Sequence, residues 1–136
     1  MRLGNTSVTA VTTSGYLFGK TTVTTIATTG AVSLTAAQMV GGVIIATGGT
    51  AGNWTSDTAA NIIAAIPGAD TSANGSSFML YIVNPSTGVT KTLVTNTGIT
   101  LSGVMTVPTA TTRQFFVQVT GAAAVTITSL GSLGTP

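Results

Sequence analysis

The stretch SFMLYIVN, residues 77–84, decides the fold class, because its residues are apolar on both faces. A strand with one solvated face would alternate apolar and polar side chains, whereas a strand covered on both sides is apolar throughout. We therefore expect residues 77–84 to form a central strand. The sequence NPSTG at 84–88 then turns the chain, since Pro, Ser, Asn and Gly are the usual turn residues.

Downstream of this stretch the sequence predicts a series of short strands. They read VTKTLVT, ITLSG, VMTV, RQFFVQVT and AVTITSL. In RQFFVQVT, the side chains alternate between two faces of the strand. One face has Phe115, Val117 and Val119, and the other has Gln114, Phe116 and Gln118. Short strands separated by turns at a spacing of about 8–12 residues are typical of sandwiches and barrels. The fold class predicted is mainly β, an antiparallel β-sandwich or jelly-roll-like barrel.

Upstream, the sequence predicts little helix. Residues 57–66, DTAANIIAAI, place their apolar side chains at helical spacing, with Ser56 or Asp57 as the cap. The sequence TAAQ at 35–38 matches a capping box and predicts a single helical turn. Residues 1–30 are rich in Thr and poor in large aliphatic residues. We expect residues 1–30 to be an extended N-terminal arm and residues 31–136 a single β-rich domain.

Charge is scarce, at 4% of the chain against about 25% in an ordinary soluble domain. The four cations are scattered and cannot neutralise the roughly six to ten phosphates that a nucleic-acid-binding protein contacts. The apolar run FMLYIV is far shorter than the roughly twenty residues that cross a bilayer as a helix. We expect no nucleic-acid or membrane partner. Low charge favours association, so the composition predicts an obligate assembly component.

The residue types argue against an enzyme. The chain has no His, no Cys and no Glu, which excludes Ser-His-Asp and Cys-His catalysis and leaves few metal ligands. A Ser–Lys pair could use Lys20 or Lys91, but no spacing supports one. Asp57 and Asp70 match a helix cap and a polar turn better than a catalytic carboxylate pair. We expect no catalytic activity, no cofactor and no metal site.

The sequence GYLFGKT at 15–21 resembles the end of a phosphate-binding loop, but three residues separate its glycines where that motif has four. The β-branched residues that follow favour a strand over the helix that such a loop requires. We interpret the segment instead as an anchor for another protein, because clustered aromatic residues often dominate interfaces. The candidate interface residues are Tyr16, Leu17, Phe18 and Lys20.

Residues 34–130 resemble structural proteins of tailed-bacteriophage virions, especially capsid decoration or cement proteins. The segments that carry the resemblance are LTAAQMVGGVI, TSDTAANIIAAIPGA, SSFMLYIVN, TLVTNTGITLSGVMTVPT and TTRQFFVQVTGAAAVTITSLG. The resemblance implies a β-rich trimer, made in the host bacterial cytoplasm, that binds the major capsid protein on the outer capsid surface and stabilises the shell across capsomer junctions.

Similar segments in phage tail fibres leave a second hypothesis open, a tail fibre or receptor-binding module. In that case an exposed Trp54 could stack on sugars, although packing beside the helix is the interpretation that we favour for this residue.

Overall fold

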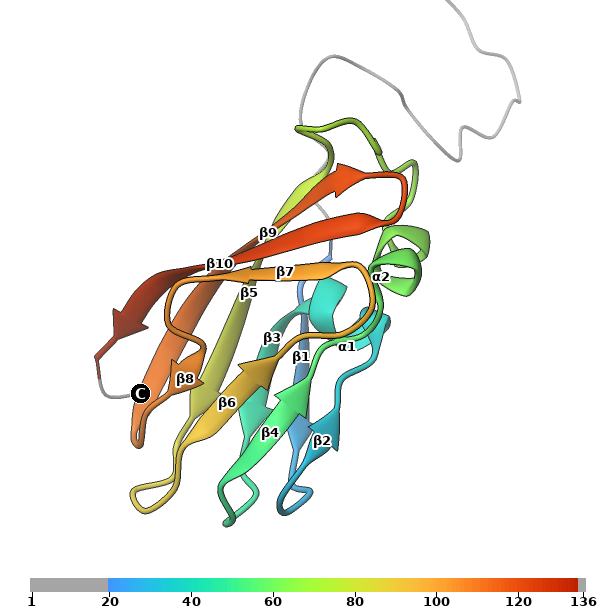
Figure 1. Cartoon of the computed structure of the whole chain (residues 1–136). Coiled ribbons are helices and arrows are strands. Elements are labelled where there is room, and N and C mark those ends of the chain that lie inside the picture. The colour runs from blue at the N-terminus through green and yellow to red at the C-terminus, as the bar shows by residue number, and fades with distance from the viewer. Residues whose placement is uncertain (1–19, 135–136) are drawn as a thin grey trace, which may run out of the picture.

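The structure is a computed structural model and describes residues 20–134. Ten strands form two sheets, which we call sheet A and sheet B (Figure 1). Sheet A has the order β1 (Thr22–Ile26), β3 (Gly42–Ala46), β5 (Ser77–Asn84), β9 (Thr111–Gly121), β10 (Ala124–Leu133) and β7 (Ile99–Ser102). Sheet B has the order β2 (Val32–Ser33), β4 (Gly52–Thr55), β6 (Lys91–Val94) and β8 (Thr106–Val107). The helices are α1 (Ala36–Gly41) and α2 (Ala59–Ala65).

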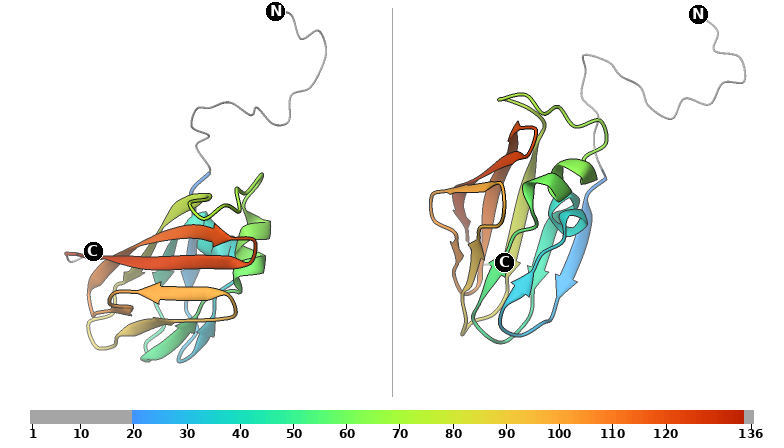
Figure 2. Two further views of the ribbon diagram at one scale, coloured as in Figure 1. Left: turned by 45° about the horizontal axis from the view of Figure 1, so that its top comes forward. Right: turned by 45° about the vertical axis from the view of Figure 1, so that its right-hand side comes forward.

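The chain alternates between the two sheets. A strand of sheet A leads to a strand of sheet B, and a short helix returns the chain to sheet A, first through β1, β2 and α1 and then through β3, β4 and α2. Both helices therefore lie at one end of the sheets (Figure 2). The sequence TAAQMV at 35–40 and the sequence TAANII at 58–63 occupy the same place in these two units.

The mainly β, two-sheet architecture confirms the predicted fold class, but the strand pairing corrects its antiparallel part. β5, β9 and β10 pair antiparallel, as do β6 and β8. The remaining pairs, β1–β3, β3–β5, β2–β4, β4–β6 and β7–β10, are parallel. Parallel neighbours require a crossover connection. For β1–β3 and β3–β5 the crossover runs through a strand of sheet B and a short helix, and for β2–β4 and β4–β6 it runs through a short helix and a strand of sheet A.

The core lies between the sheets. Leu80 and Ile82 of β5 and Phe115 of β9 are at most 1% exposed, and Trp54 and Leu93 face them from sheet B. The predicted central position of residues 77–84 is confirmed, because β5 is paired on both edges, with β3 and with β9.

The helix caps explain where the helices begin. The predicted capping box is present, with Thr35 and Gln38 each accepting a hydrogen bond from the other's backbone N–H. The cap of α2 is Thr58, whose hydroxyl accepts from the N–H of Asn61, so the prediction of Ser56 or Asp57 is wrong. Asp57 lies one residue too early for that bond and holds the side chain of Asn61 instead.

Sheet A begins before the predicted domain boundary. β1 lies within residues 1–30 and pairs in register with β3 from Thr22 to Ile26. Residues from Thr22 onward therefore belong to the folded domain, and a boundary at residue 31 is too late. The sequence TVTTI favoured a strand by composition, but its apolar residues Val23 and Ile26 are three apart, which hid the strand alternation.

Candidate functional site

The side of sheet A that faces away from sheet B is the candidate site, and we call it the outer face. Successive side chains of a strand point to opposite sides, so the residues between the buried Ile44, Leu80, Ile82, Phe115 and Val117 point outward. The apolar residues of the outer face are Val23, Val43, Ile45, Met79, Tyr81, Val83 and Phe116. Its polar residues include Thr25, Thr112, Gln114, Gln118, Thr126 and Thr128.

Strand register places the apolar residues side by side. Val23 of β1 pairs with Val43 of β3, which pairs with Tyr81 of β5. Met79 of β5 pairs with Phe116 of β9. These four strands thus present a continuous apolar area, in which Val23 is 59% exposed and the others are half-buried by their neighbours. Contiguous exposed apolar surface marks interaction sites on soluble proteins.

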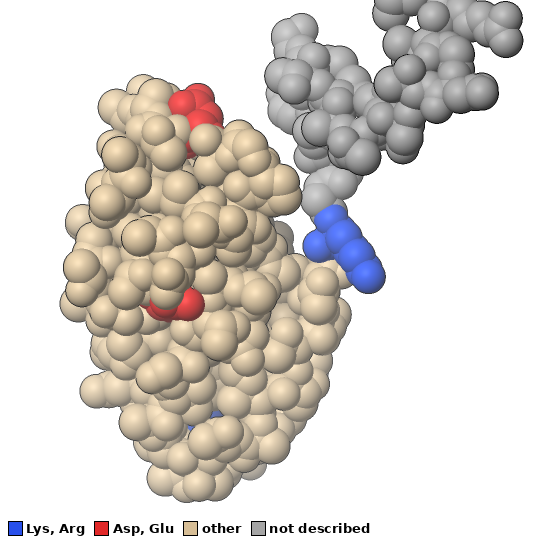
Figure 3. Space-filling view, turned by 90° about the vertical axis from the view of Figure 1, so that its right-hand side faces the viewer, with Lys and Arg blue, Asp and Glu red and all other residues tan. Residues whose placement is uncertain are grey.

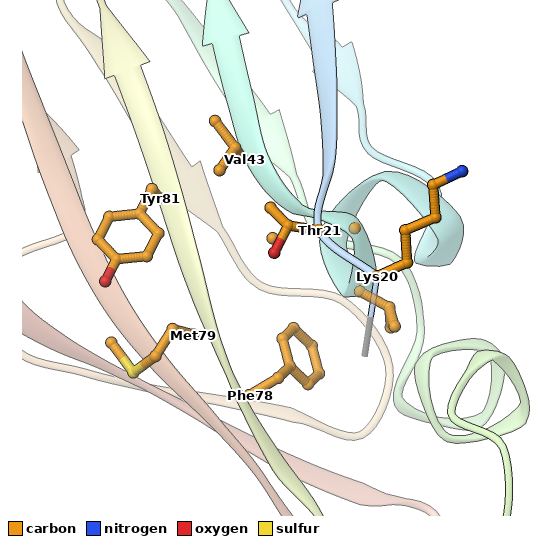
Figure 4. A pocket seen from close by; sticks show the side chains of 9 residues that line it. Lys20, Thr21, Val43, Phe78, Met79 and Tyr81 are labelled. Atoms are coloured by element: carbon orange, nitrogen blue, oxygen red, sulfur yellow. The ribbon is translucent and has the colours of Figure 1, made fainter. Parts of the chain in front are cut away.

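The outer face is hollowed beside the start of β3, where a cavity of about 240 Å³ opens. The hollow exists because consecutive glycines, Gly41 and Gly42, end α1 and begin β3 without side chains. Figure 4 shows Phe78, Met79 and Tyr81 projecting from β5 at this site, with Lys20 directed away from them. The volume is smaller than the range of about 300–1,000 Å³ typical of small-molecule pockets, so the hollow suits one or two side chains of a protein better than a ligand.

The outer face carries no charged side chain among residues 20–134. Lys91 and Arg113 are buried, Lys20 precedes β1, and Asp57 and Asp70 lie before α2 and in the loop that follows it. Figure 3 shows the same scarcity from one side, where acidic and basic atoms are isolated spots on an uncharged surface. Covering such a surface does not require the desolvation of an ion, which is the costly part of burying polar surface.

Lys91 is 1% exposed and has a structural role. Its Nζ donates hydrogen bonds to the carbonyl oxygens of Gly48 and Thr50, at 2.6 and 2.5 Å, and lies 5.9 Å from the ring centre of Trp54. Burial lowers the pKa of Lys91, because it disfavours the charged ammonium. The side chain holds the loop between β3 and β4 against β6 and is closed to a substrate, so it does not supply the Ser–Lys pair considered above.

Trp54 is fully buried, which confirms the packing interpretation and contradicts the sugar-stacking one. It pairs with Leu93 of β6 and points between the sheets. The alternation of β4 places Trp54 inward, between the exposed Asn53 and the half-buried Thr55.

The two carboxylates are engaged separately. The pKa of Asp57 is lowered, chiefly by the hydrogen bond from the side chain of Asn61. Burial raises this pKa by more than either backbone bond alone lowers it, and the N–H groups of Thr58 and Ala36 lower it further. Asp70 accepts from the N–H of Ser72 in an exposed turn, which lowers its pKa. The turn role predicted for Asp70 is confirmed, whereas Asp57 lies one residue before the cap Thr58 and bonds residues at the starts of both helices. Among residues 20–134, no cluster of three or more His, Cys, Asp or Glu side chains could hold a metal ion.

Tyr16, Leu17 and Phe18 lie outside the described residues, and Lys20 is exposed at the rim of the hollow. Thr21 continues into β1, so the Gly-Lys-Thr sequence leads to a strand, as its β-branched residues predicted. The outer face was not predicted from the sequence. Two features of the sequence indicated it: the stretch at 78–83, which is apolar on both faces, and the adjacent residues Phe115 and Phe116. Neighbouring residues of a strand point to opposite sides, so one of any two adjacent apolar residues must point outward.

Comparison with protein family models, with curated protein sequences and with solved structures finds no match for this chain. Within residues 20–134, the helices are too short to cross a membrane.

Proposed function

We propose that this chain is a structural virion protein of a tailed bacteriophage. It binds the outside of the capsid through the major capsid protein and stabilises the shell across capsomer junctions, as a trimer made in the host bacterial cytoplasm. The proposal assigns it no catalysis and no cofactor. The resemblance of residues 34–130 to decoration and cement proteins supports the phage assignment.

The observation that carries the binding role is the outer face. Its apolar rows, from Val23 through Val43 to Tyr81 and from Met79 to Phe116, offer aromatic and methionine side chains without a charge. Aromatic residues and Met are enriched in protein interfaces, and charged residues are depleted from their centres. The Nε2 of Gln114 donates a 3.0 Å hydrogen bond to Oη of Tyr81. This bond fixes the amide of Gln114 and the hydroxyl of Tyr81 relative to each other on the outer face.

The presence of several linked copies of the chain on one capsid would strengthen its binding. Each copy needs only a modest interface, since linked contacts raise the apparent affinity well above that of a single contact. Permanent interfaces are also more apolar than transient ones, which agrees with the composition of the outer face. The tail-fibre hypothesis loses the support of Trp54, because that ring is buried.

The experiment is co-sedimentation of the purified chain with empty heads assembled from the major capsid protein of the genome that encodes it. We expect Met79→Glu to lower the bound amount by at least about tenfold, since burying an unpaired carboxylate costs several kcal/mol and about 1.4 kcal/mol is a factor of ten. The matched control is Asn53→Glu, which adds the same charge to an exposed position of sheet B.

Binding that is unchanged in Met79→Glu, or equally reduced in both variants, would contradict a role for the outer face. A wild-type chain that does not sediment with the heads would contradict the capsid assignment. The mass of the free protein in solution tests the trimer separately, and a stable monomer would count against it.

A further inference from the structure

β1 forms one end of sheet A and has an open backbone edge. It pairs with β3 on one side, and no strand of residues 20–134 pairs with it on the other (Figure 2). The carbonyl oxygen of Ile26 accepts a 2.9 Å hydrogen bond from the N–H of Thr47, so the backbone groups of Ile26 face β3. Backbone groups of successive residues point to opposite edges of a strand. The N–H and C=O groups of Thr21, Val23 and Thr25 therefore face the open edge.

The other sheet ends are shorter or have partners within the chain. β2 and β8, at the ends of sheet B, have two residues each, and very short edge strands are one protection against edge pairing. β7 ends sheet A opposite β1, and its first residue, Ile99, turns its backbone groups away from β10. The N–H of Ile99 donates to the carbonyl of Asn96, and its carbonyl accepts from Oγ1 of Thr95. Among the described strands, β1 is therefore the sheet end that is both long and open.

Nothing in the sequence of β1 protects its open edge. The strand TVTTI has no charged residue, no Pro and no register shift in its pairing with β3. Val23 is 59% exposed, and Thr25 is exposed as well. An open edge of this kind is a template for another strand, and natural proteins cover or interrupt it. The occupant has to be an extended strand with an open edge of its own, and β1 of another copy is such a strand.

We propose that β1 of a second copy of this chain occupies the edge, antiparallel to the first and related to it by a twofold axis between the two Val23 residues. In an antiparallel pair, residues whose backbone groups face each other exchange two hydrogen bonds. In this register Val23 bonds the partner's Val23, and Thr21 and Thr25 bond the partner's Thr25 and the partner's Thr21. Every backbone group that β1 turns to the open edge then has a partner.

The side chains favour this register over its neighbour. Residues directly opposite each other share a face of the sheet, so Val23 meets the partner's Val23 on the outer face, and Thr22 meets the partner's Thr24 on the other face. A register centred on Thr24 would place Val23 opposite the partner's Thr25. Register follows the hydrophobic pattern, and centring on Val23 is the arrangement that covers the exposed apolar side chain of β1 with another one.

Charge does not oppose the contact. Lys20 is the charged residue nearest to β1 in the sequence and lies three positions from Val23. In the proposed register the two Lys20 residues are about six positions apart along the strands, or about 20 Å. This separation is more than twice the Debye length of about 8 Å at physiological ionic strength, so their repulsion is screened.

The pairing would join the outer faces of the two copies. The twofold axis is perpendicular to the joined sheet, so both outer faces lie on the same side, and the row from Tyr81 through Val43 to Val23 continues into the second copy. The pairing does not depend on the capsid assignment. A twofold contact alone makes a dimer, so a trimer would be built by other contacts.

A single cysteine at the axis tests the contact. The two copies of residue 23 would form a hydrogen-bonded pair with Cα atoms about 5.5 Å apart, inside the range of about 4.4–6.8 Å for disulfides. The chain has no native Cys, so a disulfide-linked dimer of Val23→Cys reports on this position alone. The matched control is Val104→Cys, because Val104 is 60% exposed and lies in the loop that follows β7, at the other end of sheet A.

We expect mild oxidation to link Val23→Cys at least about tenfold faster than Val104→Cys, since pairing holds the two thiols at a high effective concentration. Thr24→Cys tests the register. The two Thr24 residues would be diagonal neighbours about 7–8 Å apart, beyond the disulfide range, so this variant should link no faster than the control. Linking of Thr24→Cys in preference to Val23→Cys would overturn the register centred on Val23.

Sedimentation equilibrium tests the contact without a cysteine. We expect Val23→Lys to have about half the mass of the wild type, because it would place two ammonium groups directly opposite each other. Val104→Lys adds the same charge at a matched exposure and should keep the wild-type mass.

Equal masses of the wild type and Val23→Lys would overturn the proposal, and so would equal linking rates of Val23→Cys and Val104→Cys. The trimer proposed above is tested separately by the mass of Val23→Lys relative to that of one chain. The ratio of the wild-type mass to the Val23→Lys mass tests the pairing of β1, whatever the mass of the smaller unit.

Discussion

Oδ2 of Asp57 accepts a 2.7 Å hydrogen bond from the backbone N–H of Ala36, the first residue of α1. Oδ1 of the same carboxylate accepts from the N–H of Thr58 and from Nδ2 of Asn61, each at 2.7 Å, at the start of α2. One side chain therefore satisfies donors at the beginnings of both helices. Helix N-termini leave such N–H groups unpaired and favour negative charge, so Asp57 fixes the two crossover helices to each other.

Replacing this carboxylate should destabilise the fold. We expect Asp57→Ala to lower the free energy of unfolding by about 2–3 kcal/mol, since hydrogen bonds to a charged group are worth about 1.5–3 kcal/mol each and part of the loss is recovered by water. Urea denaturation at a fixed protein concentration measures the change. Asp70→Ala is the control, because Asp70 is exposed and bonds Ser72 within one turn. An equal loss in the two variants would contradict the joint capping role.

The contribution of Asp57 should depend on pH in a defined direction. Its pKa is lowered from 3.8 in the folded protein, chiefly by the side chain of Asn61, so the folded state binds this proton less readily than the unfolded chain. The stabilisation is then complete above the unfolded pKa of about 4 and is lost as the pH falls through the lower folded value.

We therefore expect the stability difference between the wild type and Asp57→Asn to be largest near neutral pH and to shrink below about pH 4. Denaturation curves of both proteins at neutral and acidic pH measure it. Because Asp70 is present in both, its own titration cancels in the difference. A difference that grows as the pH falls would show the opposite linkage and refute the assignment.

The fold class could be read from the sequence because β5 carries its signal locally. Residues 77–84 are apolar on both faces, and the alternation of RQFFVQVT correctly places Phe115, Val117 and Val119 inward. The parallel pairings could not be read in this way, since the pairing of β1 with β3 depends on where the chain goes in between. The recurrence of TAAQMV as TAANII was the available signal, because two similar helix starts indicate two similar crossovers.

The candidate site was less accessible to sequence analysis. The apolar area of the outer face is continuous only because strand register brings Val23, Val43 and Tyr81 into one row. These residues are far apart in the sequence, and no local pattern connects them. The burial of Lys91 was hidden for a similar reason, because its partners, the carbonyls of Gly48 and Thr50, lie in a loop of a different unit.

Lys91 should make the protein more stable in mildly alkaline solution. Burial lowers its pKa from 10.5, so the unfolded chain holds the proton at pH values where the folded protein has begun to release it. Stability then rises with pH in the interval between the folded pKa and 10.5. Lys91→Met, which keeps the unbranched shape without the charge, should lack this rise.

The measurement is the free energy of unfolding of both proteins near pH 7 and near pH 10. At neutral pH we expect Lys91→Met to lie within about 1 kcal/mol of the wild type, because the lost hydrogen bonds are offset by removal of a buried charge. Lys91→Ala should cost about 2–3 kcal/mol, since it leaves a cavity beside Trp54. If the stability of Lys91→Met rises with pH as steeply as that of the wild type, Lys91 is not the group responsible.

Gly98, in the turn before β7, lies against Ala59 of α2 and against Ala123 in the turn between β9 and β10, and it should tolerate a side chain poorly. Its φ is +77°, and an added Cβ would overlap the carbonyl oxygen of Ala123 and lie 2.8 Å from Cβ of Ala59. Its carbonyl also accepts from the N–H of Val125, so the backbone cannot move away without breaking a bond of β10. We expect Gly98→Ala to lower the free energy of unfolding by at least about 2 kcal/mol, from the strained φ and the overlap together.

Gly88→Ala is the matched control, since Gly88 has open space around it and no positive φ. Its free energy of unfolding should stay within about 0.5 kcal/mol of the wild-type value. Chemical denaturation of the two variants measures both values, and a Gly98→Ala protein as stable as the Gly88→Ala one would contradict the close packing of α2 against the β9–β10 hairpin.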